Sequence, residues 1–536
     1  MGSGKNKRPK AAPREIELKL AGDADAVRAL ARHPILKGAK RAPGAGGTLK
    51  ATYFDTPEGD LREAGLSVRV RAKGEAWIQT VKAERGERGL VLDRNEWEVP
   101  VAGPALDLDA AQGSGLAALL AERPELAARI APAFTVRTER RAFLIARDGA
   151  EIELVLDRAG IAAGRRRIRF GEVELELKAG DPAALFGLAR DLAEAAPLRL
   201  SLVTKAARGH ALLAGGMTPA KADKTALEPG FATAEAFRRV ARSCLAQALH
   251  NEAALRETGE AGALHQMRVG LRRLRAAVSL FKDLFDDPES ERIRAELRWF
   301  GHALGPARDL DVLAGRLQDA PEADRAPDHA AQAAAVEERR KAARDALFAL
   351  LDTPRARLVP LRTAAWIEDG EWLRSNDPAA REEPIEARAR HELSRRWKRV
   401  LKRGRRLAAL EAEPRHELRI EIKKLRYGAE FFAGLFGGRR AKERRRAVLE
   451  GLANLQETLG ELNDLAVQGH LAADAGGGPA PAADPAPADP QEAPPEGEAA
   501  AAEPAGPADG DARVADLIGR AEAEFRRLKE IKLFWA

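Results

Sequence analysis

Residues 15–20 read EIELKL, and the same alternation of charged and apolar residues returns as VELELK at residues 173–178. Successive side chains of a β-strand point to opposite faces, so in each stretch the charged residues share one face and the aliphatic residues share the other. Each stretch is therefore predicted to be a strand with one ionic face and one apolar face.

Further stretches between these two carry the same pattern. In each stretch two polar or charged residues, two positions apart, share one face of the predicted strand. The pairs are Arg69 and Arg71, Thr80 and Lys82, Glu96 and Glu98, Glu151 and Glu153, and Arg167 and Arg169. Any one such face is also typical of an antiparallel sheet that meets water on one side. Like charges two residues apart repel each other, however, so faces of both signs favour a closed sheet whose lumen holds a polyanion with divalent cations.

The chain of 536 residues is long enough for about three to four domain-sized units. From about residue 234 the apolar period changes from two to 3.6, which predicts a helical region after a strand-rich one. Residues 472–512 carry nine Asp or Glu and no Lys or Arg among many Ala and Pro, a composition typical of disorder. We predict a disordered basic tail (1–12), a strand-rich domain (13–214), a linker (215–230), a helical domain (231–471) with halves at about 231–380 and 381–471, a disordered acidic loop (472–512) and a terminal helix (513–536).

The single cysteine, Cys244, excludes disulfides within the chain and cysteine-based zinc sites. No run of about 18 apolar residues occurs, and the basic N-terminus is not followed by the apolar stretch of a signal peptide. These features predict a cytoplasmic protein with no membrane partner. The formal net charge is only +7, so the partner must be inferred from where the charges cluster.

The helical region contains an internal duplication, because HQMRVGLRRLR begins at His265 and HELRIEIKKLRY begins at His416, an offset of 151. In both copies basic residues follow the histidine at spacings of 3, 4 and 3, beside an apolar stripe on the same helix. The two basic stripes are His265, Arg268, Arg272 and Arg275, and His416, Arg419, Lys423 and Arg426. One stripe alone is also typical of a solvated flank. The repetition favours two stripes that converge on a groove or pore for a polyanion.

EIELK resembles the ExExK signature of the CYTH, or triphosphate tunnel metalloenzyme, superfamily. Further stretches of the chain resemble the other conserved blocks of this superfamily and follow in the same order. They are YFDT (53–56), SVRVR (67–71), TVKA (80–83), EIELVLDRAGI (151–161), GEVELELK (171–178) and TKAARG (204–209). The resemblance covers roughly residues 13–213. It implies an eight-stranded antiparallel tunnel that binds a triphosphate and hydrolyses its terminal phosphoryl group with Mg²⁺ or Mn²⁺.

The resemblance also implies a role for each matching residue. The implied catalytic residues are Glu15, Glu17 and Lys19, the metal ligands are Glu15, Glu17, Glu174 and Glu176, the phosphate ligands are Arg69, Arg71, Lys82, Arg141 and Lys205, and the remaining tunnel wall is Glu96, Glu98, Glu153 and Asp157. Within TERRAFLI the register is open, so Arg140 or Arg137 can take the inward place of Arg141. The nucleophile would be a water oriented by Glu15 or Glu17, and spacing identifies no general base.

The duplicated segments resemble the CHAD domain, a conserved-histidine helical domain, over about residues 231–471 plus the terminal helix. This resemblance implies binding of inorganic polyphosphate by the two basic stripes, supported by Arg308, Asp309, Asn463 and Asp464. The histidines are expected to donate hydrogen bonds to phosphate; a capping or core role and a metal-ligand role are the alternatives. The predicted fold class is multidomain α+β: an eight-stranded antiparallel β tunnel with flanking helices, then an all-α domain of two duplicated four-helix halves.

CYTH–CHAD fusions are an architecture of bacterial inorganic triphosphatases. The chain is therefore expected to hydrolyse inorganic triphosphate to diphosphate and phosphate, and to bind inorganic polyphosphate in the cytoplasm or at polyphosphate granules. The alternatives are a non-catalytic polyphosphate-binding or granule-associated protein, and a phosphatase of thiamine or nucleoside triphosphates. Nucleic acid is disfavoured because the chain has two tyrosines and its basic segments lack stacking aromatic residues. The sequence leaves the oligomeric state open.

Overall fold

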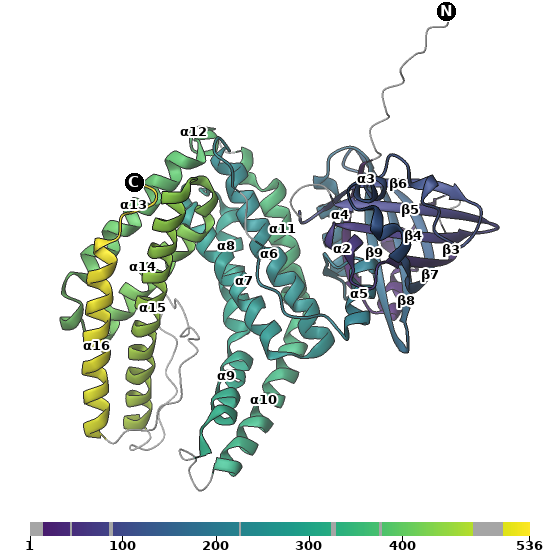
Figure 1. The fold of residues 1–536 in the computed structure, drawn as a ribbon. Helices are drawn as coiled ribbons and strands as arrows, with labels where there is room; N and C mark the ends of the chain where they lie inside the picture. Colours follow the sequence, from purple (N-terminus) through teal and green to yellow (C-terminus); the bar gives the residue numbers. More distant parts are fainter. Residues whose placement is uncertain are drawn as a thin grey trace, which may run out of the picture. The chain divides into compact units, whose positions relative to one another are not determined.

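The computed structural model describes residues 14–42, 46–84, 89–223, 227–322, 329–374, 378–474 and 507–536. The predicted basic tail and residues 475–506 of the predicted acidic loop lie outside the described residues. Figure 1 shows a closed antiparallel sheet formed by the N-terminal part of the chain and long helices formed by the rest. The predicted α+β fold class is confirmed.

The described strands all belong to one sheet. They are β1 (Arg14–Gly22), β2 (Lys40–Arg41), β3 (Gly47–Asp55), β4 (Leu66–Lys73), β5 (Ala76–Glu84), β6 (Leu92–Val101), β7 (Ala131–Arg147), β8 (Ala150–Ala163), β9 (Arg166–Ala179) and β10 (Arg199–Leu200). Eight of them follow the order β1-β6-β5-β4-β3-β7-β8-β9, and the pairing of β9 with β1 closes the ring. The short strands β2 and β10 are added to β7 and β1. The predicted eight-stranded tunnel is confirmed.

The register of β1 against β9 sends the charged side chains into the ring. Lys19 pairs with Glu174 and Glu17 with Glu176, so the ionic faces of EIELKL and VELELK lie on the same side of the sheet. On the opposite side the paired residues Leu18 and Leu175 are fully buried. Helices pack on this outer side, so the apolar face is already covered and the ionic face lines the lumen.

Five helices accompany the sheet: α1 (Ala24–Leu30), α2 (Asp60–Glu63), α3 (Gly115–Glu122), α4 (Ala183–Ala195) and α5 (Lys205–Ala214). The start of α5 is fixed by Thr204, whose Oγ1 accepts a hydrogen bond from the Ala207 N–H at 3.1 Å. Gly209 lets α5 approach β7 closely, because a Cβ there would lie 2.1 Å from the ring of Phe134. This close packing holds Lys205, the first residue of α5, at the tunnel.

The later helices are α6 (Thr233–Thr258), α7 (Ala261–Leu280), α8 (Pro288–Ala303), α9 (Gly305–Asp319), α10 (His329–Leu351), α11 (Pro354–Asp369), α12 (Pro378–Glu382), α13 (Ile385–Arg403), α14 (Ala412–Phe431), α15 (Arg439–Asp474) and α16 (Pro507–Glu530). The chain divides into two compact units. The first unit contains the tunnel together with Arg242–Gly270 and Phe348–Gly370; the second contains Asp223–Ala241, Leu271–Leu347 and Glu371–Ala536. Part of the helical region thus packs with the tunnel as one body.

The duplication is present in the structure. α7 and α14 have the same length and begin at Ala261 and Ala412, the offset of 151 read from the sequence. A 3-10 turn follows each of them at the same offset, Lys282–Leu284 and Ala433–Leu435. α15 then runs unbroken where the first copy has the two helices α8 and α9.

The last helix packs against α15 and the turn before α14. Leu517, Phe525 and Leu528 are buried on its inner face. Gly404 permits the contact, since a Cβ there would lie 2.4 Å from the Phe525 ring. α15 ends at Asp474 and α16 begins at Pro507, so helix extends into both ends of the range predicted as a loop.

Candidate functional site

The tunnel encloses a cavity of about 320 Å³ whose lining is dominated by charge. Its cationic side chains are Lys19, Arg69, Arg71, Lys82, Arg94, Arg140, Lys178 and Lys205. Its carboxylates are Glu15, Glu17, Glu96, Glu98, Glu153, Glu174 and Glu176. Eight cations and seven carboxylates therefore face one small volume, and apart from Arg141 and Asp157 every tunnel residue expected from the sequence is among them.

Lys19 is the centre of a buried cluster between β1 and β9. Its Nζ lies 2.5 Å from Glu17 Oε1, 2.5 Å from Glu174 Oε1 and 3.2 Å from Glu172 Oε1. Burial alone would lower the pKa of Lys19, but these three carboxylates together raise it above its usual range. Lys19 thus stays protonated, and removing one partner from such a cluster costs about 3–5 kcal/mol.

Lys205 reaches the same carboxylates from α5. Its Nζ lies 2.5 Å from Glu172, 2.7 Å from Glu174 and 2.8 Å from Asp157. Burial opposes the charge of Glu174, yet Lys19, Lys205 and Arg140 hold the pKa of Glu174 well below its usual value. Glu172 is fully buried, and burial raises its pKa.

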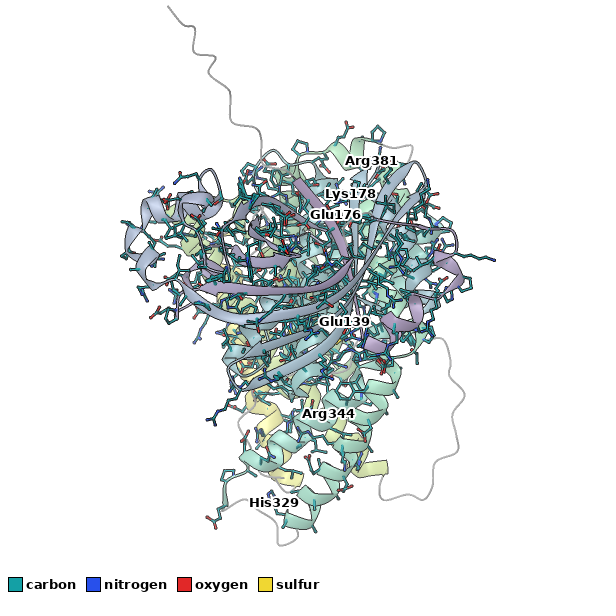
Figure 2. All side chains as sticks on the ribbon, turned by 90° about the vertical axis from the view of Figure 1, so that its right-hand side faces the viewer. Glu139, Glu176, Lys178, His329, Arg344 and Arg381 are labelled. Atoms are coloured by element: carbon teal, nitrogen blue, oxygen red, sulfur yellow. The ribbon has the colours of Figure 1, made fainter. Side chains whose placement is uncertain are left out.

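A second cluster lies between β1, β5 and β6. Lys82 Nζ donates to both oxygens of Glu15 at 2.7 Å, and Arg94 Nη2 bridges Glu15 and Glu17 at 3.1 and 2.7 Å. Burial raises the pKa of Glu15, but Lys82 and Arg94 outweigh it and lower that pKa. At the other side of β1, Figure 2 shows Glu176 and Lys178 side by side on β9, where they form an ion pair of 2.6 Å.

The structure corrects one expected phosphate ligand. Arg141 lies exposed on the outer face of β7, and Arg140 takes the inward place. Arg140 pairs across strands with Asp157 and donates to it at 2.8 and 2.6 Å, and to Glu174 at 2.9 Å. Arg137 is exposed as well, because the odd-numbered residues of this stretch face outward. Asp157 therefore acts behind the lining, as the fully buried partner of Arg140 and Lys205.

Two tunnel residues escaped the sequence interpretation, although the pattern contained both. Arg94 stands two residues before Glu96, and Glu172 stands two residues before Glu174, so each continues a charged face already recognised. Both are among the most buried charged residues of the tunnel, at 9% and 0% exposure.

Several buried polar atoms of the lumen lack a partner among the described residues. The Nε atoms of Arg69 and Arg71 donate no hydrogen bond there. Glu17 Oε1 accepts none, since its contact with Lys19 is an ion pair without hydrogen-bond geometry. Glu172 Oε2, which is buried behind the lining, accepts none either. Since unsatisfied buried polar groups are costly, these atoms indicate a ligand that has both acceptor oxygens and cations.

The carboxylates also suit a hard divalent cation. Oxygens of Asp157, Glu172 and Glu174 lie within 4.8 Å of one another, and Mg²⁺ prefers such oxygen ligands. Of the four metal ligands expected from the sequence, only Glu174 belongs to this trio. Glu15, Glu17 and Glu176 line the same cavity, where lysine and arginine side chains balance their charge.

A second charged cavity, of about 270 Å³, lies in the helical region of the second unit. We call it the basic groove; its cations are Arg272, Arg275, Lys282, Arg294, Arg298, Lys423 and Lys424. Among the described residues no carboxylate lines it. Arg272 Nε donates to the hydroxyl of Tyr427 at 2.8 Å, which joins the two duplicated helices α7 and α14 across the groove.

Only part of each predicted basic stripe lines the basic groove. Arg272, Arg275 and Lys423 do, whereas His265 and Arg268 occupy earlier turns of α7. Arg419 is 2% exposed, and Arg426 lines a neighbouring cavity, where it lies 3.5 Å from Glu430.

The residues predicted to support polyphosphate binding do not line the basic groove together. His416 Nδ1 lies 3.2 Å from Asn463 Oδ1. Arg308 and Asp309 lie on α9, away from the groove lining. The side chain of Asp464 lies outside the described residues. Lys282, Arg294 and Arg298, which the sequence interpretation missed, come from the turn after α7 and from α8.

Comparison with known families matches the CYTH domain to residues 13–210 and the CHAD domain to residues 239–473. The chain contains a CYTH domain followed by a CHAD domain. The tunnel belongs to the CYTH domain, and the basic groove belongs to the CHAD domain. A CYTH domain supports triphosphate hydrolysis at the level of the family.

Individual relatives resemble parts of the chain. An inorganic triphosphatase of Haemophilus influenzae is 25% identical over 161 residues, 30% of this chain and 45% of that protein. An uncharacterised protein of Mycobacterium tuberculosis is 27% identical over 288 residues, 50% of this chain and 53% of that protein. The chain thus spans about half the length of these relatives.

Among solved structures, the CHAD domain of Ricinus communis covers 59% of this chain and 98% of its own length at 28% identity, with a TM-score of 0.45. A Hippeastrum protein with a dominant triphosphatase activity covers 38% and 98% at 18% identity, with a TM-score of 0.29. Within the described residues, none of the helices is both long and apolar enough to cross a membrane.

Proposed function

We propose that the CYTH tunnel hydrolyses inorganic triphosphate to diphosphate and phosphate, and that the basic groove of the CHAD domain binds inorganic polyphosphate. The observation that carries the first part is the lumen itself, where eight cations and seven carboxylates face about 320 Å³. A bare anion is attracted by the cations but repelled by the carboxylates. A phosphate chain that arrives with divalent cations complements both.

Each side of the lumen has a proposed task. Arg69, Arg71, Lys82, Arg140 and Lys205 hold the phosphate oxygens, and Glu15, Glu17, Glu174 and Glu176 hold the cation, with Mg²⁺ or Mn²⁺ as the expected ion. When bound, such an ion supplies positive charge next to the transferred phosphoryl group. The buried Nε donors of Arg69 and Arg71 support the phosphate assignment, because they point to acceptor oxygens that the described protein does not provide.

The nucleophile is a water molecule. A carboxylate oxygen of Glu15 or Glu17 orients it in line with the bond between the terminal phosphorus and the bridging oxygen. As the new phosphorus–oxygen bond forms, that bridging bond breaks and the diphosphate leaves with its electron pair. One proton of the attacking water stays on the released phosphate as its P–OH group, and the other passes to the diphosphate or to solvent. Arg140, Lys205 and the other cations stabilise the charge on the phosphoryl oxygens without moving, since their own ion pairs hold them in place.

The lining of the tunnel favours an inorganic substrate over an organic one. Its uncharged residues are few, and Tyr53 is its one aromatic side chain among the described residues. A nucleoside or thiamine group would need apolar and stacking contacts, and in this cavity only Leu49, Tyr53, Val155 and Ala206 can provide them. The decisive experiment compares phosphate release from tripolyphosphate, ATP, thiamine triphosphate and long-chain polyphosphate, with Mg²⁺ and then Mn²⁺.

We expect tripolyphosphate to be hydrolysed fastest and Glu17→Ala to lower the rate of release by about 10²- to 10³-fold. Arg141→Ala is the matched control, since this arginine is exposed on the outer face. Unchanged turnover by Glu17→Ala would refute the assignment of the tunnel.

Polyphosphate binding is proposed from the groove's seven cations, and it is measured separately, with long-chain polyphosphate and full-length protein. If polyphosphate binds but none of the four compounds is hydrolysed, the non-catalytic alternative replaces the enzyme.

A further inference from the structure

Arg357 of α11 is a buried cation whose guanidinium contacts backbone carbonyls of the tunnel domain. It is 8% exposed, and its Nη1 donates to the carbonyls of Ala193, Ala196 and Leu198 at 2.9, 2.7 and 3.3 Å. Ala193 lies in the last turn of α4, where carbonyls have no partner within the helix. A positive charge there also complements the negative end of the helix dipole.

The segment that Arg357 holds continues directly into the lumen. Leu200 of β10 pairs with Leu20 of β1, and the Ser201 N–H donates to the Lys19 carbonyl at 3.0 Å. Four residues further on, Lys205 places its Nζ 2.5–2.8 Å from Asp157, Glu172 and Glu174. Residues 196–205 therefore connect the α11 contact to one proposed phosphate ligand and to the strand that carries Glu15 and Glu17.

This segment has little freedom to shift without moving β1. Leu198 is fully buried, and its Cδ2 would lie 2.7 Å from a Cβ added to Gly22, at the end of β1. Such close packing means that a displacement of Leu198 is transmitted to β1, because protein interiors have few voids to absorb it.

The geometry points to Arg357 as a positioning residue for the tunnel, supplied by the helical domain: it fixes residues 196–205 and through them sets the place of Lys205 and of β1. Arg357 lies within the residues that match the CHAD domain, while the three carbonyls that its Nη1 contacts lie within the CYTH match. Its Nε donates to the Asp352 carbonyl at 3.1 Å, which fixes the guanidinium to its own domain. All of these residues belong to the first compact unit. The inference deepens the proposed function and rests on it for its kinetic readout.

A neighbouring contact of the same helices provides a control. Arg362 of α11 lies 3.5 Å from Glu194 of α4, and both side chains are about half exposed. This pair joins the same two helices but touches no carbonyl of the segment. An exposed ion pair of this kind contributes little to stability.

The test uses the full-length chain. Arg357→Met keeps an unbranched apolar stem and removes the guanidinium with all its donors. We expect kcat for tripolyphosphate to fall about tenfold while KM changes less than twofold, since small misplacements of catalytic groups lower the rate strongly. Arg357→Lys, which keeps a charged donor, should recover at least half of the lost rate. Arg362→Ala should behave as the parent protein.

A second measurement does not depend on activity. Hydrogen exchange of the amides from Leu198 to Lys205 should become at least fivefold faster in Arg357→Met and stay unchanged in Arg362→Ala. If Arg357→Met does not fold, Arg357→Lys tests the inference in its place. For Arg357→Lys we expect a kcat below that of the parent protein and faster exchange from Leu198 to Lys205, both by smaller factors than those given for Arg357→Met.

Two outcomes would overturn the inference: a folded Arg357→Met with the parent kcat, or unchanged exchange from Leu198 to Lys205. A lower melting temperature with both of these unchanged would show that Arg357 only joins the helices. If the parent protein hydrolyses none of the triphosphates, the proposed function fails, and the exchange experiment alone still decides whether Arg357 fixes the segment.

Discussion

The CYTH tunnel and the basic groove both gather lysine and arginine, but they differ in what accompanies these cations. In the tunnel, seven carboxylates stand against eight cations, and ion pairs of 2.5–3.1 Å join many of them. In the groove, seven cations stand together, and the described lining contains no carboxylate.

This difference teaches what each site can bind. A nearly neutral lumen gains little from a bare anion, so its ligand must bring positive charge of its own. A uniformly cationic groove attracts a bare polyanion over a distance of about a Debye length, and salt weakens that attraction. The difference supports our proposals that the tunnel hydrolyses a metal-bound phosphate chain and that the groove captures a polyanion reversibly.

The largest expected effect is the separation of the two sites by chelation. Excess EDTA should abolish hydrolysis of tripolyphosphate, and Glu17→Ala with Mg²⁺ present should lower kcat by about 10²- to 10³-fold, as for the loss of one transition-state contact. Phosphate release is measured alongside the Kd for polyphosphate. Binding by the groove should survive both treatments, and its loss on chelation would break the comparison.

The next effect concerns the register of β7. Arg140→Ala removes a lumen cation held by Asp157 and Glu174, so kcat/KM for tripolyphosphate should fall about 10- to 100-fold. Arg141→Ala changes an exposed residue of the same strand and should leave the value unchanged. Steady-state kinetics of the two variants are compared; equal losses would contradict the inward place of Arg140.

These arginines also show where sequence reasoning stops. The alternation of EIELKL decided which residues face inward on β1, because Glu15, Glu17 and Lys19 mark one face and leucine the other. TERRAFLI offers charged residues at both odd and even positions, so period two cannot choose between them. Only pairing with β8, which puts Arg140 opposite Asp157, settles the register, and strand pairing is a long-range property.

The helical domain shows the same limit. The offset of 151 identified the repeated helices, and the structure keeps it to the residue for α7 and α14. Which flank residues meet across the groove depends on how α8 packs against these helices. Lys282, Arg294 and Arg298 therefore could not be found from the duplicated motif, since they lie outside it.

A smaller effect tests the groove. Arg298→Ala removes an exposed cation that lines it, so polyphosphate affinity should fall about three- to tenfold, and the slope of log affinity against log salt should become less steep by about one. Lys402→Ala removes another exposed cation, on α13 and outside the groove lining, and serves as the control. Polyphosphate titrations at several salt concentrations give both values, and identical losses would mean that binding follows total charge alone.

The smallest effect lies within the tunnel and concerns stability. Lys82 and Arg94 lower the pKa of Glu15 although burial opposes them, so its ionised form stabilises the fold; that contribution is complete above the ordinary value of 4.5 and is lost as pH falls through the folded-state pKa. Burial, aided by Glu15 and Glu153 against the opposing pull of Lys178, raises the pKa of Glu176. Its ionised form therefore destabilises the fold, and this penalty disappears as pH falls through the raised pKa.

Glutamine resembles the protonated carboxyl, so Glu15→Gln and Glu176→Gln should move stability in opposite directions at pH 7. We expect a lower urea midpoint for Glu15→Gln and a slightly higher one for Glu176→Gln, with both differences shrinking as the pH is lowered towards 4. Both variants should lose hydrolysis, because both carboxylates line the lumen. A lower urea midpoint for Glu176→Gln at pH 7 would mean that the ion pair with Lys178 stabilises the ionised carboxylate more than burial destabilises it. Glu176 would then already be satisfied by Lys178, and its burial would not favour a bound cation.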